Sequence, residues 1–164
     1  MPKIKLILLL ILISGGLLFS SLAQDRSLEI KKLSKGADVI LTGKVTKQNS
    51  SWNENKTRIF TKATLQVDEY LKGNNSGNSI EVTYPGGEVG DVGELYTHMP
   101  RFTNDEEVLV FLKKDQKSKE FKVFDGEDGK ITVIKDAKTG EKFTGSNVKI
   151  NSLKREIKNY LNEK

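Results

Sequence analysis

The chain has 164 residues, which is enough for one domain, and its formal net charge is +5. It contains no cysteine, which excludes disulfides, thiolate metal sites, cysteine nucleophiles and a lipid-modified N-terminal cysteine. Basic residues concentrate in residues 113–164, whereas residues 24–112 carry a small excess of acids. A basic end favours binding to an anionic surface, although a soluble surface of mixed charges explains the same composition.

The beginning of the chain has the pattern of a secretory signal peptide, residues 1–23. Lys3 and Lys5 give a short basic start, and an unbroken apolar run follows. Small residues before position 24 suit signal peptidase, so we expect cleavage between Ala23 and Gln24. An uncleaved anchor is the alternative, but the apolar run falls short of the roughly 20 residues that span a bilayer. The sequence therefore predicts export, to the periplasm or to the medium.

The mature chain, residues 24–164, is expected to be one exported domain without a transmembrane segment. Residues 27–34 can form one or two turns of helix. The apolar pattern then changes to a period of two, which is typical of strands with one buried face. We expect strands at residues 39–45, 57–67, 80–84, 108–112, 121–124 and 131–134.

Individual residues add detail to these strands. Gly43 lies inside the first strand and predicts a bend or a close approach of backbone. The strand 57–67 is long, and long coiled strands are what a small closed barrel needs. Its alternation slips at residues 69–71, which indicates a bulge or the strand end. The run 108–112 is continuously apolar and predicts a strand that is buried on both faces.

Polar and glycine-rich stretches predict the connections. Residues 48–55, with Trp52 at their centre, are expected to form a loop, and residues 88–103 a long connection. The sequence Asp-Gly-Glu-Asp-Gly at 125–129 is expected to join its two neighbouring strands as a hairpin. After a further turn, the apolar spacing of Leu153, Ile157, Tyr160 and Leu161 predicts a C-terminal helix, residues 151–162, packed on the sheet.

The order of these features resembles the inhibitory domain of the tissue inhibitors of metalloproteinases and the wider netrin-module group. The similar stretches are Ala37-Asp38-Val39-Ile40, Leu71-Lys72-Gly73, Ile80-Glu81-Val82-Thr83-Tyr84 and Glu106-Glu107-Val108-Leu109-Val110-Phe111-Leu112, so the resemblance covers residues 37–113. It implies a mainly β fold, a five-stranded OB-like Greek-key barrel, here with extra C-terminal hairpin strands and a C-terminal α-helix. Those inhibitors chelate zinc through an N-terminal cysteine. This chain has none, so no inhibitory residue is carried over.

The single histidine, His98, is the first candidate for chemistry. It is a conceivable general base or metal ligand, but catalysis would also need a nucleophile and an orienting acid, and no Gly-x-Ser-x-Gly element is present. A zinc site without cysteine would need several carboxylates. We therefore predict no catalytic residue, no metal site and no cofactor. A hydrolase that uses Glu88 and Asp91 beside His98 is the least favoured alternative.

Two further patterns fall short of a binding motif. The acids of residues 125–129 lack the ligand spacing of a calcium loop, and a turn explains them. The glycines of residues 85–93 are not followed by the lysine of a phosphate-binding loop. OB barrels also bind single-stranded nucleic acid, and Trp52, Phe60, Tyr70 and Phe102 are conceivable stacking residues. Export and the acidic excess of residues 24–112 argue against nucleic acid as a partner.

Residues 86–102 are the segment that we expect to face a partner, because loops on a rigid barrel commonly carry binding. The candidate residues are Gly86, Gly87, Glu88, His98, Arg101 and Phe102. The leading hypothesis is an exported, non-enzymatic protein-binding module, inhibitor-like in its simplest form, whose partner is another exported protein such as a protease. The alternative is an envelope-associated structural protein, which residues 113–164 hold on an anionic surface.

Overall fold

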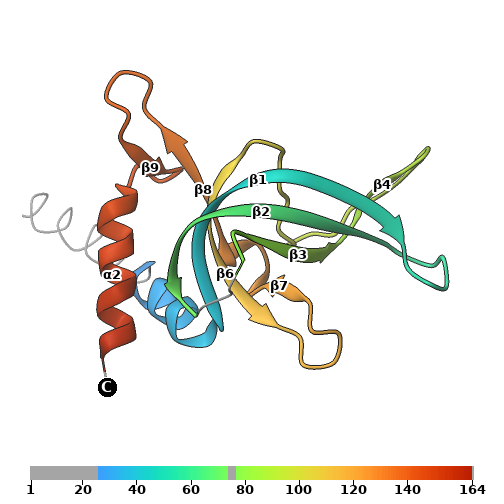
Figure 1. The fold of residues 1–164 in the computed structure, drawn as a ribbon, viewed down its shortest axis with the longest axis horizontal. Coiled ribbons are helices and arrows are strands. Elements are labelled where there is room, and N and C mark those ends of the chain that lie inside the picture. Colours follow the sequence, from blue (N-terminus) through green and yellow to red (C-terminus); the bar gives the residue numbers. More distant parts are fainter. Residues whose placement is uncertain (1–25, 74–76, 164) are drawn as a thin grey trace, which may run out of the picture. The chain divides into compact units, whose positions relative to one another are not determined.

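The computed structural model describes residues 26–73 and 77–163 (Figure 1). The chain divides into two units, residues 1–32 and 33–164, and all strands lie in the second. Residues 26–36 are helical, where the sequence predicted helix at 27–34. The expected signal peptide and its cleavage site lie outside the described residues.

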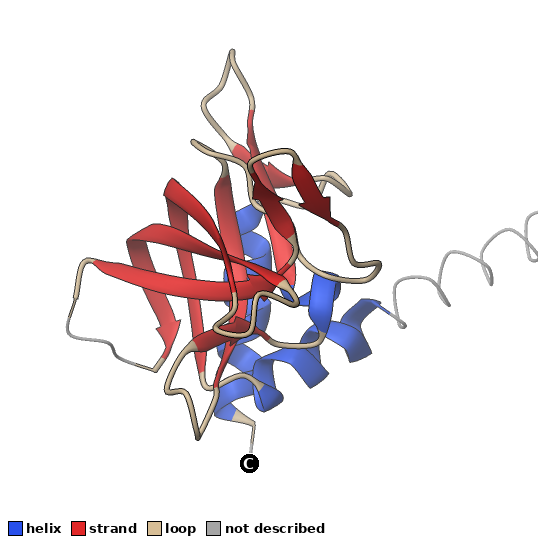
Figure 2. Cartoon of the chain, turned by 90° about the vertical axis from the view of Figure 1, so that its right-hand side faces the viewer, coloured by secondary structure: helices blue, strands red, loops and turns tan. Residues whose placement is uncertain are grey.

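Five strands form a closed ring (Figures 1 and 2). They are β1 (Val39–Trp52), β2 (Ile59–Lys72), β3 (Ser79–Pro85), β6 (Glu107–Lys114) and β7 (Phe121–Val123). Their order around the ring is β1-β2-β3-β7-β6, and β6 pairs back with β1. Neighbours are antiparallel except β3 and β7, which are parallel and meet at a single pair of residues, Val82 and Phe121. The predicted mainly β, five-stranded OB-like barrel is confirmed.

The remaining elements lie outside the ring. β4 (Gly87–Val89) and β5 (Val92–Glu94) form a separate two-stranded sheet. β8 (Lys130–Lys135) pairs with β6, and β9 (Lys142–Thr144) extends the sheet further. The C-terminal helix α2 (Ile150–Asn162) is confirmed, and it buries Leu153 and Ile157 as the spacing predicted. Lys154 and Lys158 of α2 contact Glu69 near the end of β2.

The predicted loop at residues 48–55 is wrong, because β1 continues to Trp52 and pairs with β2 up to Ile59. The polar composition misled the prediction for a physical reason. β1 pairs with β6 only from Val39 to Lys44, so its later residues run past β6 and need no apolar face. The turn that joins β1 to β2 comprises residues 53–58. The Asn53 side chain stabilises it by accepting hydrogen bonds from the backbone N–H groups of Thr57 and Arg58.

The predicted hairpin at residues 125–129 is also wrong. β7 and β8 do not pair with each other. Both pair antiparallel with β6, β7 near its end and β8 near its beginning. The short 3-10 helix Gly126–Gly129 joins β7 to β8. The chain therefore keeps the same direction in both strands instead of reversing, as it would in a hairpin. Glycine is needed at 129 because any Cβ there would overlap the carbonyl oxygen of Phe124.

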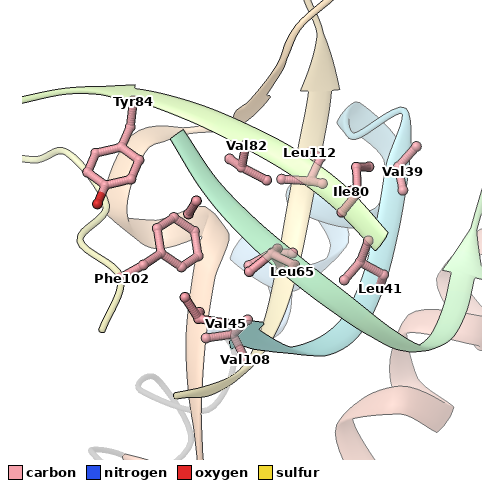
Figure 3. Close-up of a cluster of buried hydrophobic side chains, with 12 residues drawn as sticks. Val39, Leu41, Val45, Leu65, Ile80, Val82, Tyr84, Phe102, Val108 and Leu112 are labelled. Atoms are coloured by element: carbon pink, nitrogen blue, oxygen red, sulfur yellow. The ribbon is translucent and has the colours of Figure 1, made fainter. Parts of the chain in front are cut away.

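The barrel core follows the alternation of the strands (Figure 3). Its buried side chains are Val39, Leu41, Val45, Ala63, Leu65, Ile80, Val82, Tyr84, Phe102, Val108, Val110 and Leu112. β6 is buried on both faces, as its apolar run predicted, since Leu109 and Phe111 are fully buried as well. Gly43 meets the backbone of Gln66 so closely that a Cβ would overlap its carbonyl oxygen, which confirms the predicted close approach. Register shifts in the β1–β2 pairing leave Asp68 and Leu71 unpaired, close to the predicted bulge.

Candidate functional site

The segment 86–102 folds as the β4–β5 hairpin followed by a loop that ends at Phe102. β4 packs against both β1 and β2 near the turn that joins them (Figure 1). The predicted long connection therefore contains a hairpin of its own, whose tip is Gly90 and Asp91. The segment stands on rigid strands instead of being a free loop, and rigid scaffolds are the usual support for binding residues.

Two glycines let the hairpin approach β1 and β2. A Cβ on Gly87 would overlap the hydroxyl oxygens of Thr61 and Ser50, and both Gly86 and Gly87 have positive φ angles, 97° and 128°. The buried Thr61 hydroxyl donates a hydrogen bond of 2.7 Å to the Gly86 carbonyl oxygen. Ser50 Oγ lies 2.8 Å from Thr61 Oγ1. Gly86 and Gly87, which the sequence proposed as partner contacts, thus form the base on which the hairpin sits.

Glu94 at the end of β5 fixes the other side of the hairpin. Its Oε2 accepts hydrogen bonds from the backbone N–H of Ile59, at 3.0 Å, and from the Tyr96 hydroxyl, at 2.9 Å. The hydrogen bond to this carboxylate raises the pKa of the Tyr96 hydroxyl. The Arg58 guanidinium lies 6.0 Å from the centre of the Tyr96 ring. Sequence reasoning missed Glu94, because no spacing pattern shows that residue 94 meets the start of β2.

Tyr84 and Phe102 are the two core residues that flank this segment in the sequence (Figure 3). Their ring centres are 5.5 Å apart. The Tyr84 hydroxyl donates to Gln48 Oε1 at 2.7 Å, and burial raises its pKa. Phe102 is only 6 % exposed, which corrects the expectation that it offers an exposed surface to a partner or to a nucleic-acid base. Its apolar ring packs in the core instead.

A pocket of about 560 Å³ opens between the hairpin, the loop and the strands beneath them. Buried Thr61, Tyr84 and Phe102 line it together with exposed Glu88 and Arg101. Exposed apolar side chains are frequent in the same segment, and two of them, Leu95 and Met99, line the pocket. Of the five large apolar side chains that are exposed among the described residues, three belong to this segment: Val92, Leu95 and Met99, at 47 %, 69 % and 39 % exposure. We call these three residues the rim surface.

His98 lies on the outer side of the loop, with a positive φ of 59° and a highly exposed ring. Its Nδ1 is 3.2 Å from Glu127 Oε1, and its carbonyl oxygen accepts a hydrogen bond from the Glu127 backbone. The structure thus brings together the histidine and the acidic 125–129 turn, which the sequence treated separately. Within residues 26–73 and 77–163, no three histidine, aspartate or glutamate side chains converge as metal ligands.

A second anchor holds the C-terminal end of the segment. Glu106 Oε1 accepts hydrogen bonds of 2.6 Å from both Lys130 Nζ and the Thr132 hydroxyl. Its Oε2 accepts one of 3.0 Å from the Thr103 backbone. The Lys130 and Glu106 side chains are only 11 % and 12 % exposed, so solvent screens this ion pair weakly. Lys130 Nζ also lies 5.3 Å from the centre of the Phe102 ring.

Among the residues that the structure describes, no helix combines the length and the apolar character needed to cross a bilayer. No known protein family and no curated protein matches the sequence.

Proposed function

We propose that the chain is an exported, non-enzymatic module that binds another exported protein through the rim surface. The observation that carries this proposal is the clustering of exposed apolar side chains. Val92, Leu95 and Met99 lie within one short segment beside a pocket, whereas exposed apolar residues are otherwise sparse among the described residues. Clustered apolar exposure beside a pocket is typical of interaction sites.

The way the segment is held supports a binding role. Ser50, Thr61 and Glu94 fix the hairpin at one end, and Glu106 fixes the chain at the other. A surface that is ordered before it binds loses little conformational entropy on association. The pattern of a signal peptide in residues 1–23 supports export, and hence an exported partner.

An extended segment of the partner fits this surface best. β5 pairs with β4 and with no other strand among the described residues, so its second edge has no neighbour in the sheet. An extended chain can add to such an edge, with alternate side chains directed toward the surface. The partner's apolar residues would contact Leu95 and Met99. A protease whose active-site cleft or surface loop takes this position would make the module an inhibitor.

The test is affinity capture with a matched control. The purified protein is immobilised, exposed to the envelope and secreted fractions of the producing cells, and compared with the double variant Leu95→Ser, Met99→Ser. Ile134→Ser is the control, because it removes an apolar side chain that is 53 % exposed on β8, outside the segment. We expect one partner that the control retains and the double variant loses. Retention of the same partner by all three proteins would contradict the proposal.

The captured partner then allows a direct measurement. Titration calorimetry with the purified partner should give an affinity at least about tenfold weaker for the double variant, since apolar residues near the centre of an interface commonly contribute this much.

Binding to an anionic surface has weaker support. Of the twelve described lysines in residues 113–164, seven pair with acids within the fold: Lys113, Lys122, Lys130, Lys142, Lys149, Lys154 and Lys158. This alternative predicts sedimentation with anionic vesicles that disappears in high salt.

A further inference from the structure

The hydroxyl hydrogens of the pocket are already used within the fold. Each hydroxyl group has one hydrogen, and Thr61 gives its hydrogen to the Gly86 carbonyl oxygen. Ser50 must therefore donate in the 2.8 Å contact with Thr61, so that its oxygen keeps only lone pairs. The Tyr84 hydrogen goes to Gln48, and the Tyr96 hydrogen goes to Glu94. None of the four hydroxyls that line the pocket thus has a hydrogen left to donate to a ligand.

The Glu94 carboxylate adds a negative charge to these acceptors. Its Oε2 already accepts two hydrogen bonds, which fix the position of the group. Its Oε1 has no partner among the described residues. A half-buried, immobilised carboxylate oxygen without a donor is a strong site for a cation, because charge-assisted hydrogen bonds are the strongest of the ordinary kinds.

The apolar part of the lining suits the stem of a long side chain. Leu95, Tyr96 and Met99 line the pocket around the polar groups. Lysine and arginine bury their methylene stems along apolar surface while the charged end reaches polar groups. Their charged ends carry donors and no acceptors, which complements a pocket whose hydroxyl hydrogens are all engaged and whose carboxylate has an oxygen without a donor.

From these features we propose that the pocket binds a lysine or arginine side chain of the partner protein, with the cation against Glu94 Oε1. This inference rests on the proposed function and specifies the chemistry of the bound segment. The segment would have a basic residue between apolar residues, which contact the rim surface. Arg101 also lines the pocket, is exposed, and forms no hydrogen bond among the described residues. The positive charge of Arg101 repels a second cation, so it should lower the affinity of the pocket for the basic side chain.

The test uses a defined probe. An acetylated and amidated pentapeptide, Ala-Leu-Arg-Leu-Ala, is titrated into the isotope-labelled protein, and amide shifts are followed by NMR. The comparison peptide has citrulline in place of arginine, which keeps the shape and removes the charge. We expect saturable shifts at Gly87, Gly93 and Glu94 with the arginine peptide, and an affinity at least about tenfold lower with the citrulline peptide.

Variants of the protein test the same contact from the side of the pocket. Glu94→Gln should weaken the arginine peptide about tenfold, because the amide can still accept the hydrogen bonds from Ile59 and Tyr96 but has no charge. Asp91→Asn is the matched control, since it removes an acid at the hairpin tip that does not line the pocket. Arg101→Gln should strengthen binding about twofold.

Three outcomes would overturn this inference: equal binding of the citrulline peptide, unchanged binding by Glu94→Gln, or the absence of saturable shifts at millimolar arginine peptide. Weaker binding by Arg101→Gln would also overturn it, because the guanidinium would then hold the ligand. None of these outcomes affects the capture experiment, in which loss of the partner depends on Leu95 and Met99. The two proposals can therefore fail separately.

Discussion

The inner and outer parts of the β1–β2 pair belong to the same two strands but are stabilised in different ways. The inner part, residues 39–48 and 63–72, buries apolar side chains such as Leu41, Val45 and Leu65 in the barrel. The outer part, residues 49–52 and 59–62, meets the β4–β5 hairpin through the hydroxyls of Ser50 and Thr61. The inner part should therefore contribute most of the free energy of unfolding, whereas the outer part determines the shape of the candidate site.

Truncating the inner part should have the largest effect on stability. Leu65 is fully buried, so Leu65→Ala removes apolar packing and leaves a cavity, at a cost of about 3–5 kcal/mol in the free energy of unfolding. Urea denaturation measures this cost. Leu95→Ala, which truncates an exposed leucine of the rim surface, should change the same free energy by less than about 0.5 kcal/mol. Equal costs for the two variants would refute the division between the two parts.

Filling the contact between the outer part and the hairpin should have the next largest effect. In Gly87→Ala the new methyl group overlaps Thr61 and Ser50 at a φ of 128°, which should cost about 2–3 kcal/mol. Gly90→Ala is the control, because a Cβ at the hairpin tip meets nothing within 4 Å, and only the strain of its positive φ, about 1 kcal/mol, remains. Thermal unfolding of both variants tests this, and a Gly90 variant as unstable as the Gly87 variant would rule out the steric explanation.

Removing one hydroxyl from the outer part should have a moderate effect. Thr61→Val keeps the shape of the buried side chain but leaves the Gly86 carbonyl oxygen without its donor and Ser50 without its acceptor. We expect a loss of about 1–2 kcal/mol, together with NMR shift changes at Gly86 and Gly87. Thr64→Val, at a position further along β2, is a suitable control. The Thr64 backbone oxygen, not its hydroxyl, accepts the hydrogen bond from Thr46. Shift changes spread evenly over the barrel would count against a local role.

Acid should weaken the inner part slightly. Lys154 and Lys158 hold the pKa of the Glu69 carboxyl below its ordinary value of 4.5 by hydrogen bonding and charge. A carboxyl whose folded pKa is depressed stabilises the fold fully above its unfolded pKa, and this contribution is lost as pH falls through the folded pKa. The Glu69 side chain is 40 % exposed, so the contribution is at most about 1 kcal/mol. Glu69→Gln should be less stable than the native protein at neutral pH and equally stable in acid. A difference that persists in acid would assign the effect to packing.

The sequence patterns predicted the inner part and the β2 side of the outer part, residues 59–62, but they missed the β1 side, residues 49–52, for a physical reason. Alternating apolar residues reveal a strand where one face is buried and the other is not, as in residues 63–66. Residues 39–43, which showed the same alternation in the sequence, are in fact buried on both faces. Asn49, Ser50 and Ser51 form an equally regular strand, but their neighbours are a second strand and a hairpin instead of a core. Likewise, the role of Glu94 depends on Ile59, which lies far away in the sequence. The segment 86–102 could be selected as a loop, but its exposed apolar residues and its pocket become visible only in three dimensions.

The junction between β3 and β7 is the shortest in the ring. The single pair Val82 and Phe121 closes a ring whose other four junctions are longer ladders. In hydrogen-exchange experiments, the amides of β7 should therefore exchange by local opening, whereas those of β6 and the inner part of β1 should exchange only by global unfolding. We therefore expect the closed barrel to open first between β3 and β7, where a single residue pair joins the two strands.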